Sequence, residues 1–246
     1  MGGSRDNDAV KVARARRAQW PGSSFLTGLE EPVLCDFLAA GELVRFRNRQ
    51  VLLTEGDTTS DVFLLLDAFV KVTAQLDSGG QALLAIRVGG DIVGEIAFMD
   101  GGDRTATVSA CAHEPVSAVR LGRDTLRDLL GHYPDASLSL MAAIGHKLRT
   151  ATRRRVDITG CPPRVRMARA VLELAEDYGR PVAWAPGTSI GVNLTQIELG
   201  TLIGVGKSTA ERALRSLKKD GLVGNAQQRR LVVPDMEALR AAAWPS

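Results

Sequence analysis

Apolar residues change their spacing twice along the 246 residues of this chain. A first short helix is predicted over residues 32–40, with Pro32 in its first turn and Gly41 at its end. Residues 43–121 instead hold short apolar runs divided by glycine and aspartate, a pattern typical of β-strands. The predicted strands are residues 43–46, 50–53, 61–67, 69–76, 82–88, 106–111 and 117–121. Strands so short and so closely spaced favour a small antiparallel barrel or jelly roll over a sheet of alternating strands and helices.

The spacing becomes helical after residue 123. A short helix is predicted near residues 125–130 and a long one over residues 135–158. The long helix carries a narrow seam of residues spaced three and four apart: Leu138, Met141, Gly145, Leu148 and Thr152. Such a seam pairs two helices, so we expect a dimerisation helix, with packing on its own barrel as the alternative. The break at residues 159–163, Thr-Gly-Cys-Pro-Pro, predicts a hinge between two domains.

A second pair of helices is predicted beyond the hinge, after a helix over residues 165–178. Thr195 and Glu198 form a capping box at the start of a helix that stops at Gly204. The next helix begins at residue 207 and ends at Gly221. Two short helices joined by a glycine turn are typical of a helix-turn-helix, whose second helix enters the major groove of DNA. Residues 222–233 are predicted to form a β-hairpin wing.

The same segment contains GVGKST at residues 204–209, which is part of the P-loop motif of NTP-binding proteins. That motif requires a glycine at position 201, where this chain has Thr201, and it follows a strand rather than a capped helix. DNA binding is therefore the better interpretation, because lysine and arginine can read guanine while hydroxyl groups bind bases or phosphates. The predicted DNA-contacting residues are Thr195, Gln196, Lys207, Ser208, Thr209, Arg212, Arg215 and Arg230.

The charge distribution supports this division of the chain. The net charge is +3, but residues 52–103 hold nine acidic side chains and two basic ones. Residues 147–169 hold eight basic side chains and one acidic, and residues 207–230 hold seven basic and two acidic. The basic stripes suggest that the second half faces nucleic acid, with a solvated helix face as the alternative. The basic residues 1–24 are expected to form a frayed or weakly helical extension rather than a signal peptide.

Several other classes of protein are disfavoured. The three cysteines and three histidines are scattered, so we expect neither a disulfide framework nor a metal site. No apolar run approaches the roughly 20 residues that span a bilayer, so we expect a cytoplasmic protein that does not enter the membrane. Paired acid–base carboxylates and an activated nucleophile are also missing, so no catalytic residue is assigned and the chain is not expected to be an enzyme.

The segment GEIAFMDGGDRTAT, residues 94–107, carries the candidate ligand chemistry. Arg104 can clamp two phosphate oxygens, and Thr105 and backbone amides can donate to the same anion. Glu95 can accept a hydrogen bond from a ribose hydroxyl, and Gly94 supplies a turn. This combination, placed between two predicted strands, suits a sugar that carries a cyclic phosphate.

Residues 94–107 resemble the phosphate-binding cassette of cyclic-nucleotide-binding domains, and the order of parts from residue 25 to 233 resembles the CRP/FNR family of bacterial transcription regulators. The resemblance implies an α+β fold with an N-terminal β jelly-roll cyclic-nucleotide-binding barrel, a long dimerisation helix and a C-terminal winged helix-turn-helix. The implied domains are residues 1–24 (basic extension), 25–134 (barrel), 135–160 (dimerisation helix and hinge) and 161–246 (DNA-binding domain). The implied ligand contacts are Gly94, Glu95, Ile96, Arg104, Thr105 and Thr152.

The chain departs from the family pattern at three places. The family uses two adjacent hydroxyl residues late in the dimerisation helix to contact adenine, whereas this chain has Ala151 and Thr152. A glycine usual between two barrel strands is replaced near Ala68. The recognition helix has Lys207 and Ser208 where the family often has an Arg-Glu pair, so the operator should differ. Without clustered N-terminal cysteines, the iron–sulfur branch of the family is excluded.

The sequence thus predicts a homodimeric transcription regulator that binds a palindromic operator in double-stranded DNA and responds to a cyclic nucleotide. Cyclic AMP is the preferred effector and cyclic GMP the other choice, and no further cofactor is expected. RNA polymerase is a candidate partner. Two alternatives stay open: a regulator that binds DNA constitutively because its pocket is vestigial or takes another ligand, and a nucleotide-binding subunit that acts on a protein partner.

Overall fold

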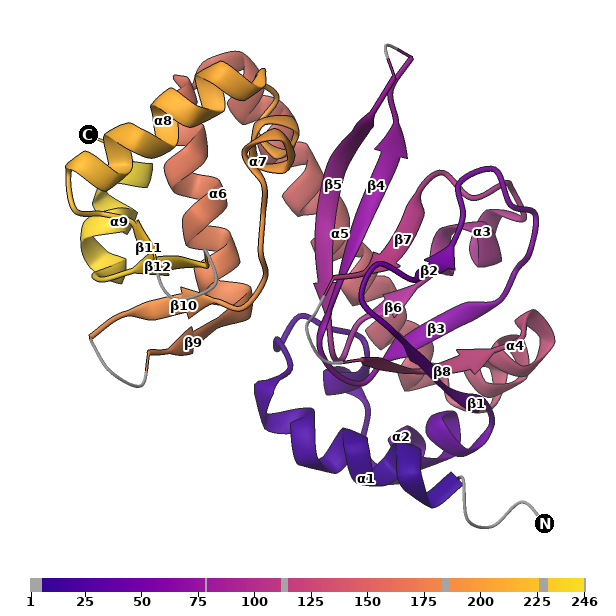
Figure 1. Ribbon diagram of the computed structural model, residues 1–246. Coiled ribbons are helices and arrows are strands. Elements are labelled where there is room, and N and C mark those ends of the chain that lie inside the picture. Colours follow the sequence, from indigo (N-terminus) through magenta and orange to yellow (C-terminus); the bar gives the residue numbers. More distant parts are fainter. Residues whose placement is uncertain (1–5, 78, 112–114, 183–185, 226–229, 246) are drawn as a thin grey trace. The chain divides into compact units, whose positions relative to one another are not determined.

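The computed structural model describes residues 6–77, 79–111, 115–182, 186–225 and 230–245 (Figure 1). The chain divides into two compact units, Met1–Leu148 and Arg149–Ser246. The division falls inside the long helix α5 (Pro134–Gly160), which therefore contributes to both units. A break between Gly160 and Pro163 follows it, where a hinge was predicted. Within the described residues, no helix is both long enough and apolar enough to cross a membrane.

The N-terminal unit contains two four-stranded antiparallel sheets, with strand orders β1-β8-β3-β6 and β2-β7-β4-β5. The strands are β1 (Glu42–Phe46), β2 (Val51–Leu53), β3 (Val62–Leu65), β4 (Phe69–Gln75), β5 (Gln81–Val88), β6 (Ile92–Val93), β7 (Thr107–Ala110) and β8 (Val116–Leu121). Inward-facing residues of both sheets, among them Phe46, Phe63, Val70 and Val108, form one core. The fold confirms the predicted barrel and all seven predicted strands, and adds β6, whose two residues are too few to give a periodic signal.

Helices close one end of this barrel and share a second core with it. They are α1 (Asp6–Arg16), α2 (Glu31–Ala39), α4 (Arg123–His132) and the first turns of α5, together with the 3₁₀ turns η1 (Arg17–Gln19) and η2 (Leu26–Gly28). Short alternating strands therefore give way to amphipathic helices where the sequence predicted the change. The short helix α3 (Glu95–Asp100) lies apart from this group, between β6 and β7 (Figure 1).

The basic N-terminal segment was expected to be a frayed or weakly helical extension, and in the structure it forms a helix that packs into the core. Ala9 and Ala13 of α1 are buried in the second core, and the indole of Trp20 donates to the carbonyl of Leu66 at 3.0 Å. Arg14 and Arg17 both bind Glu31 at the start of α2. Alanine carries little hydrophobic signal in a sequence, but it allows close helix contact, so the docking was not visible in the apolar pattern.

The C-terminal unit contains the predicted helix-turn-helix, together with a small antiparallel sheet that is larger than the predicted wing. Its helices are α6 (Pro163–Tyr178), α7 (Gln196–Leu202), α8 (Lys207–Lys219) and α9 (Met236–Ala243). Its strands are β9 (Gly179–Pro181), β10 (Thr188–Ile190), β11 (Gly224–Asn225) and β12 (Leu231–Val233), in the order β11-β12-β10-β9. Strands β11 and β12 are the predicted wing, whereas β9, β10 and α9 were not predicted.

The last turns of α5 belong to this unit because they are tied to α6. Asp157, which is buried, forms an ion pair with Arg169, and Arg154 forms another with Glu173. Ile158 packs against the helix-turn-helix itself: a Cβ atom on Gly204 would lie 2.7 Å from the Ile158 Cδ1 atom. The end of α5, α6 and the turn of the helix-turn-helix therefore form one packed cluster.

Candidate functional site

The glycine turn before α3 is required by its backbone and by its surroundings. Gly94 is the N-cap of α3 with φ of 90°, a left-handed conformation that glycine adopts without cost. A Cβ atom at this position would lie 2.7 Å from the Nη1 atom of Arg104 and 2.9 Å from the carbonyl oxygen of Asp61. Any side chain here would therefore displace the guanidinium, which explains why this cassette carries glycine.

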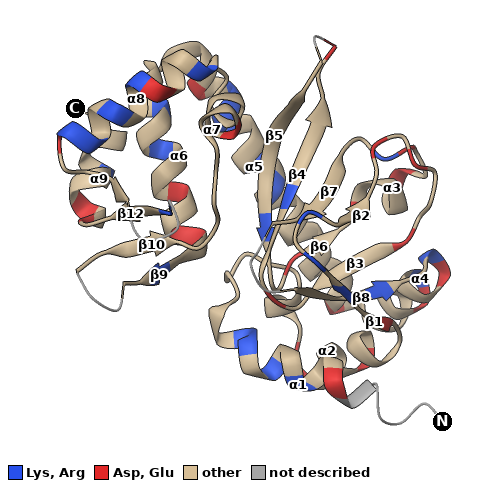
Figure 2. Ribbon diagram, viewed as in Figure 1, with Lys and Arg blue, Asp and Glu red and all other residues tan. Residues whose placement is uncertain are grey.

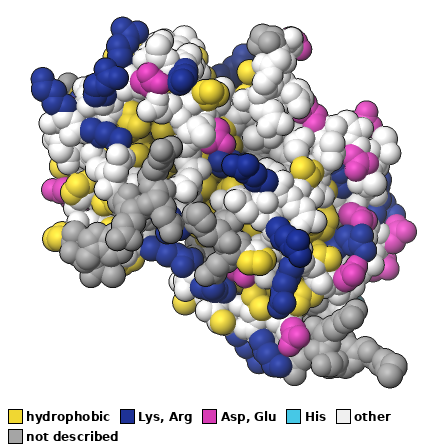
Figure 3. Space-filling view, in the orientation of Figure 1, with side chains coloured by type: hydrophobic (Ala, Val, Ile, Leu, Met, Phe, Trp, Pro, Cys, Tyr) yellow, Lys and Arg dark blue, Asp and Glu magenta, His cyan; other side chains and the backbone are white. Residues whose placement is uncertain are grey.

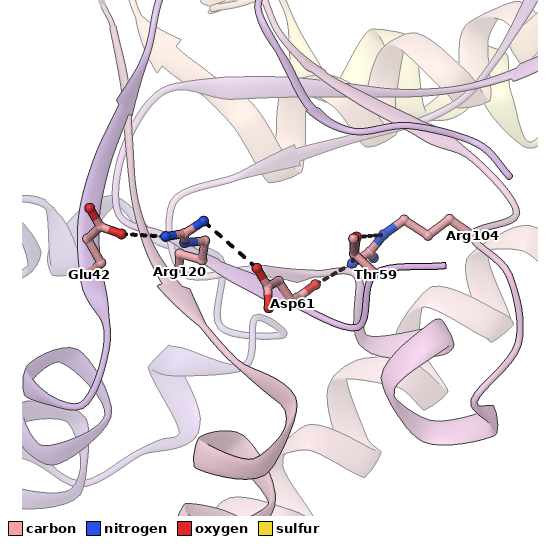
Figure 4. A network of polar contacts seen from close by, with 5 residues as sticks. All are labelled: Glu42, Thr59, Asp61, Arg104 and Arg120. Atoms are coloured by element: carbon pink, nitrogen blue, oxygen red, sulfur yellow. Dashed lines mark hydrogen bonds and ion pairs between the residues drawn. The ribbon is translucent and has the colours of Figure 1, made fainter. Parts of the chain in front are cut away.

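Arg104 is held beneath this turn and is only 4% exposed. Its Nη2 atom donates to the carbonyl of Asp61 at 2.6 Å, and its Nε and Nη2 atoms both lie 3.4 Å from the Thr59 hydroxyl (Figure 4). Burial lowers the pKa of Arg104, while the nearby carboxylates of Asp57, Asp61 and Glu95 oppose that shift. Because a guanidinium stays protonated in proteins, the barrel holds a fixed buried cation at this point.

Glu95 is the first residue of α3 and is 6% exposed. Its Oε1 atom accepts a hydrogen bond of 2.9 Å from the Nζ atom of Lys147, which also donates to the carbonyl of Ile92 at 2.6 Å. Lys147 lies on α5 and was not predicted as a site residue. The sequence marks Lys147 only by its position next to Leu148 of the seam. It lies 52 residues from Glu95, so no local motif includes both residues.

The remaining predicted ligand residues lie at different places. Ile96 is 52% exposed on α3, and Thr105 is exposed directly after Arg104. Thr152 is exposed on α5 and belongs to the C-terminal unit. The structure thus brings Gly94, Glu95 and Arg104 together, with Ile96 and Thr105 adjoining them in sequence.

The replaced glycine predicted near Ala68 is visible in the backbone. Ala68, between β3 and β4, has φ of 57°, one of two positive values among the described residues other than glycine. A left-handed conformation costs an L-residue with a side chain about 1–2 kcal/mol. At this position the backbone therefore has the left-handed conformation that favours glycine, although the residue is alanine.

The helix-turn-helix begins with the capping box predicted from the sequence. The Thr195 hydroxyl accepts from the backbone N–H of Glu198 at 3.1 Å, and the Glu198 carboxylate accepts from the backbone N–H of Thr195 at 2.7 Å. Both side chains thus satisfy amides that a helix start leaves without partners. Gln196 is exposed on the first turn, and Gly204, with φ of 68°, makes the turn into α8.

Helix α8 separates a buried apolar face from an exposed basic one. Ala210, Ala213, Leu214 and Leu217 are buried. The predicted reading residues Lys207, Ser208, Arg212 and Arg215 are exposed, and Thr209 is half-buried with its hydroxyl 3.4 Å from Arg212 Nη2. Figure 2 shows several Lys and Arg positions along α8, and Figure 3 shows acidic side chains gathered over the barrel unit.

The wing is joined to α8 by a polar contact. Lys218 Nζ donates to Asn225 Oδ1 of β11 at 2.9 Å, and β11 pairs with β12. Arg230, the predicted wing residue, is half-buried directly before β12. A hollow of about 670 Å³ lies between the start of α7, α8 and the wing, with Thr195, Lys207 and Lys218 on its walls. Within the described part of the chain, no group of three or more His, Cys, Asp or Glu side chains could hold a metal ion.

Two family models match the two units. Residues 43–133 match the cyclic nucleotide-binding domain, and residues 165–242 match the Crp-like helix-turn-helix domain. Between them they account for the barrel with its cassette and for the helix-turn-helix with its wing. They confirm the two types of domain that the sequence predicted.

Whole-chain comparisons find the same combination of domains. The CRP-like cAMP-activated global transcriptional regulator of Mycobacterium tuberculosis is 26% identical over 221 residues, 90% of this chain and 96% of that protein. Among solved structures, FixK2 from Bradyrhizobium japonicum has a TM-score of 0.69 at 19% identity, covering 84% of this chain and 98% of its own. The c-di-GMP-responsive global regulator CLP of Xanthomonas campestris has a TM-score of 0.67 at 21% identity, covering 84% and 100%. The chain therefore belongs to the CRP/FNR family of DNA-binding transcription regulators.

Proposed function

We propose that this regulator binds DNA under allosteric control by a cyclic nucleotide, with cyclic AMP as the preferred effector. The observation that carries the proposal is the pair of buried, oppositely charged side chains at the cassette, Arg104 and Glu95. A buried cation beside a glycine turn suits an anionic phosphate, and a buried carboxylate nearby suits a sugar hydroxyl.

Each cassette residue has a role in that complex. Arg104 neutralises and clamps the cyclic phosphate, and Thr105 donates its hydroxyl to the same group. Glu95 accepts the ribose hydroxyl: its Oε1 is bound to Lys147, and a carboxylate has a second oxygen with free lone pairs for this bond. Gly94 leaves room for the guanidinium, and Ile96 borders the ligand. Thr152 of the partner subunit contacts the base.

The base of the effector differs among relatives of this chain. The M. tuberculosis relative is described as cAMP-activated, whereas CLP, with the same fold, is c-di-GMP-responsive. This chain has Ala151 in place of one of the two hydroxyls that the family uses for adenine, so the base is held with fewer hydrogen bonds. Cyclic GMP is the second candidate effector, and constitutive DNA binding with a differently liganded pocket is the second candidate function.

The DNA complex uses the exposed face of α8. Lys207, Arg212 and Arg215 are exposed on the side of α8 opposite its apolar face, so they are accessible to base edges and phosphates. Ser208 and Thr209 add hydroxyl groups on the same helix. Thr195 and Gln196 contact the DNA backbone from the start of α7. Arg230 contacts the DNA backbone from the wing.

In a homodimer, the two copies of α8 bind the two half-sites of a palindromic operator. Leu138, Met141 and Leu148 of α5 are each more than half exposed, so the predicted seam presents an apolar stripe for a second copy. The chain acts in the cytoplasm as a regulator without catalytic activity, and RNA polymerase is the partner through which an activator of this kind would work.

Calorimetric titration tests the coupling. Cyclic AMP and cyclic GMP are titrated into the full chain with and without operator DNA. Because the linkage is reciprocal, DNA should tighten nucleotide binding by the same factor by which nucleotide tightens DNA binding. A nucleotide affinity that is the same with and without DNA would refute allosteric control. Absence of nucleotide binding, together with steep salt dependence of DNA binding, would favour the constitutive regulator.

A further inference from the structure

The loop between β2 and β3 forms a wall beside Arg104 that the cassette motif does not include. Its sequence from residue 57 is Asp-Thr-Thr-Ser-Asp. The loop is tied to the cassette through the backbone: the N–H of Arg104 donates to the carbonyl of Asp57 at 3.1 Å, and the N–H of Gly56 donates to the carbonyl of Arg104 at 2.8 Å. The two segments therefore hold a fixed distance from each other.

Two acceptors of this loop bind the same edge of the guanidinium (Figure 4). Thr59 Oγ1 lies 3.4 Å from both Nε and Nη2, and the carbonyl of Asp61 lies 2.6 Å from Nη2. Within the described residues no acceptor contacts Nη1, the atom nearest to the glycine turn at Gly94. The loop thus holds the Nε–Nη2 edge of the guanidinium, and the Nη1 atom can donate to an anion.

The Thr59 hydroxyl can donate a hydrogen bond to a ligand. A hydroxyl is one donor and two acceptors, and here its oxygen faces a cation, so its own proton must point away from the guanidinium. The Thr59 side chain is exposed, which leaves that proton accessible to a ligand. Its backbone N–H donates to Asp57 Oδ1 at 3.0 Å, a bond that lowers the pKa of Asp57 and holds the loop in place.

Ion pairs of Arg120 restrain the end of the loop at Asp61. Arg120 of β8 binds Glu42 of β1 at 2.6 Å and lies 4.0 Å from the carboxylate of Asp61 (Figure 4). These three side chains are partly exposed, so solvent screens their attraction and the link contributes little energy. Its effect is on position, because it restrains the residue whose carbonyl binds Arg104.

We propose that Thr59 is a positioning and specificity-determining residue of the phosphate site. It holds the Nε–Nη2 edge of Arg104 so that Nη1 faces the ligand, and it donates its hydroxyl proton to one exocyclic oxygen of the cyclic phosphate. This inference rests on the proposed binding of a cyclic nucleotide at the cassette. It assigns to Thr59, in the loop between β2 and β3, a direct share in ligand recognition.

Phosphorothioate nucleotides test the contact with that oxygen. The Sp and Rp isomers each replace a different exocyclic oxygen with sulfur, a weaker acceptor. Affinities of the full chain for the parent cyclic nucleotide and for both isomers are measured by calorimetry for the wild type, Thr59→Val, Thr59→Ser and the matched control Thr58→Val. Thr58 is exposed one residue away on the same loop, and thermal denaturation checks that every variant is folded.

We expect Thr59→Val to weaken binding of the parent nucleotide by about tenfold, or about 1.4 kcal/mol. It should also bring the ratio of the two isomer affinities closer to one, while Thr59→Ser restores both and Thr58→Val changes neither. Unchanged affinity in Thr59→Val, or an equal loss for all three nucleotides, would overturn the inference while leaving the proposed function intact. A wild-type chain that binds no cyclic nucleotide would overturn both.

Discussion

Lys147 of α5 donates a hydrogen bond of 2.9 Å to the carboxylate of Glu95 in the cassette, and both side chains are largely buried. The helix that carries the exposed seam is thereby fixed to the residue expected to hold the ribose. A ligand that changes the bonding of Glu95 would act on α5 at the same time. This contact is a short physical route between the cassette and the predicted dimer interface.

Replacing Lys147 with methionine should lower the free energy of unfolding by about 3–5 kcal/mol. The substitution keeps the length of the side chain but leaves the Glu95 carboxylate buried without its partner, and an unpaired buried charge costs more than the pair contributed. Denaturant titration measures the loss. In a double-mutant cycle with Glu95→Gln, the double variant should lose less than the two single variants together. Additive losses would mean that the two groups do not interact.

Replacing Arg104 with leucine should weaken cyclic-nucleotide binding by at least about tenfold, because charge-assisted bonds to the phosphate are worth about 1.5–3 kcal/mol. Arg104→Lys is the matched control, since lysine keeps the positive charge but lacks the planar set of N–H donors of a guanidinium. Its affinity should fall between those of the wild type and the leucine variant. Calorimetry on the folded variants measures the series, and a leucine variant with full affinity would assign the cassette another task.

The sequence predicts the barrel, the cassette and the helix-turn-helix because each depends on local signals. Alternating apolar positions indicate strands, and Thr195 with Glu198 marks a helix start within four residues. The contact between Lys147 and Glu95 depends instead on how α5 crosses the barrel, which no spacing in the sequence encodes. The docking of α1 depends on the small size of Ala9 and Ala13, which a hydrophobic pattern registers weakly. Strands β9 and β10 have three residues each, too few for a period to appear.

Replacing Ala68 with glycine should raise the free energy of unfolding by about 0.5–1 kcal/mol. Glycine adopts the positive φ of this position without the steric cost of a Cβ atom, and its greater freedom in the unfolded chain offsets part of that gain. The matched control is Ala85→Gly in β5, where φ is not positive and glycine should destabilise by about 0.5–1 kcal/mol. Equal losses at both positions would show that the backbone at Ala68 is unstrained.

Replacing Arg212 with alanine should cost about 1–3 kcal/mol of binding to the preferred operator and relax the preference at one base pair. The arginine is exposed on the basic face of α8, which is the face proposed to read DNA. Binding assays across a set of operator variants separate the two possible roles. A loss that is equal for all sequences would identify a phosphate contact instead. Lys11→Ala on α1 is the control for the loss of one exposed positive charge.

The packing of Ile158 on Gly204 determines where this chain can be cut and rejoined in a chimaera. A graft that begins at residue 163 would leave Gly204, Arg169 and Glu173 facing foreign side chains from the end of α5. A graft that begins at residue 149 transfers those partners together. The interchangeable DNA-reading module of this regulator is therefore the winged helix-turn-helix with the last turns of α5 attached, and specificity should be transplanted between relatives at that junction.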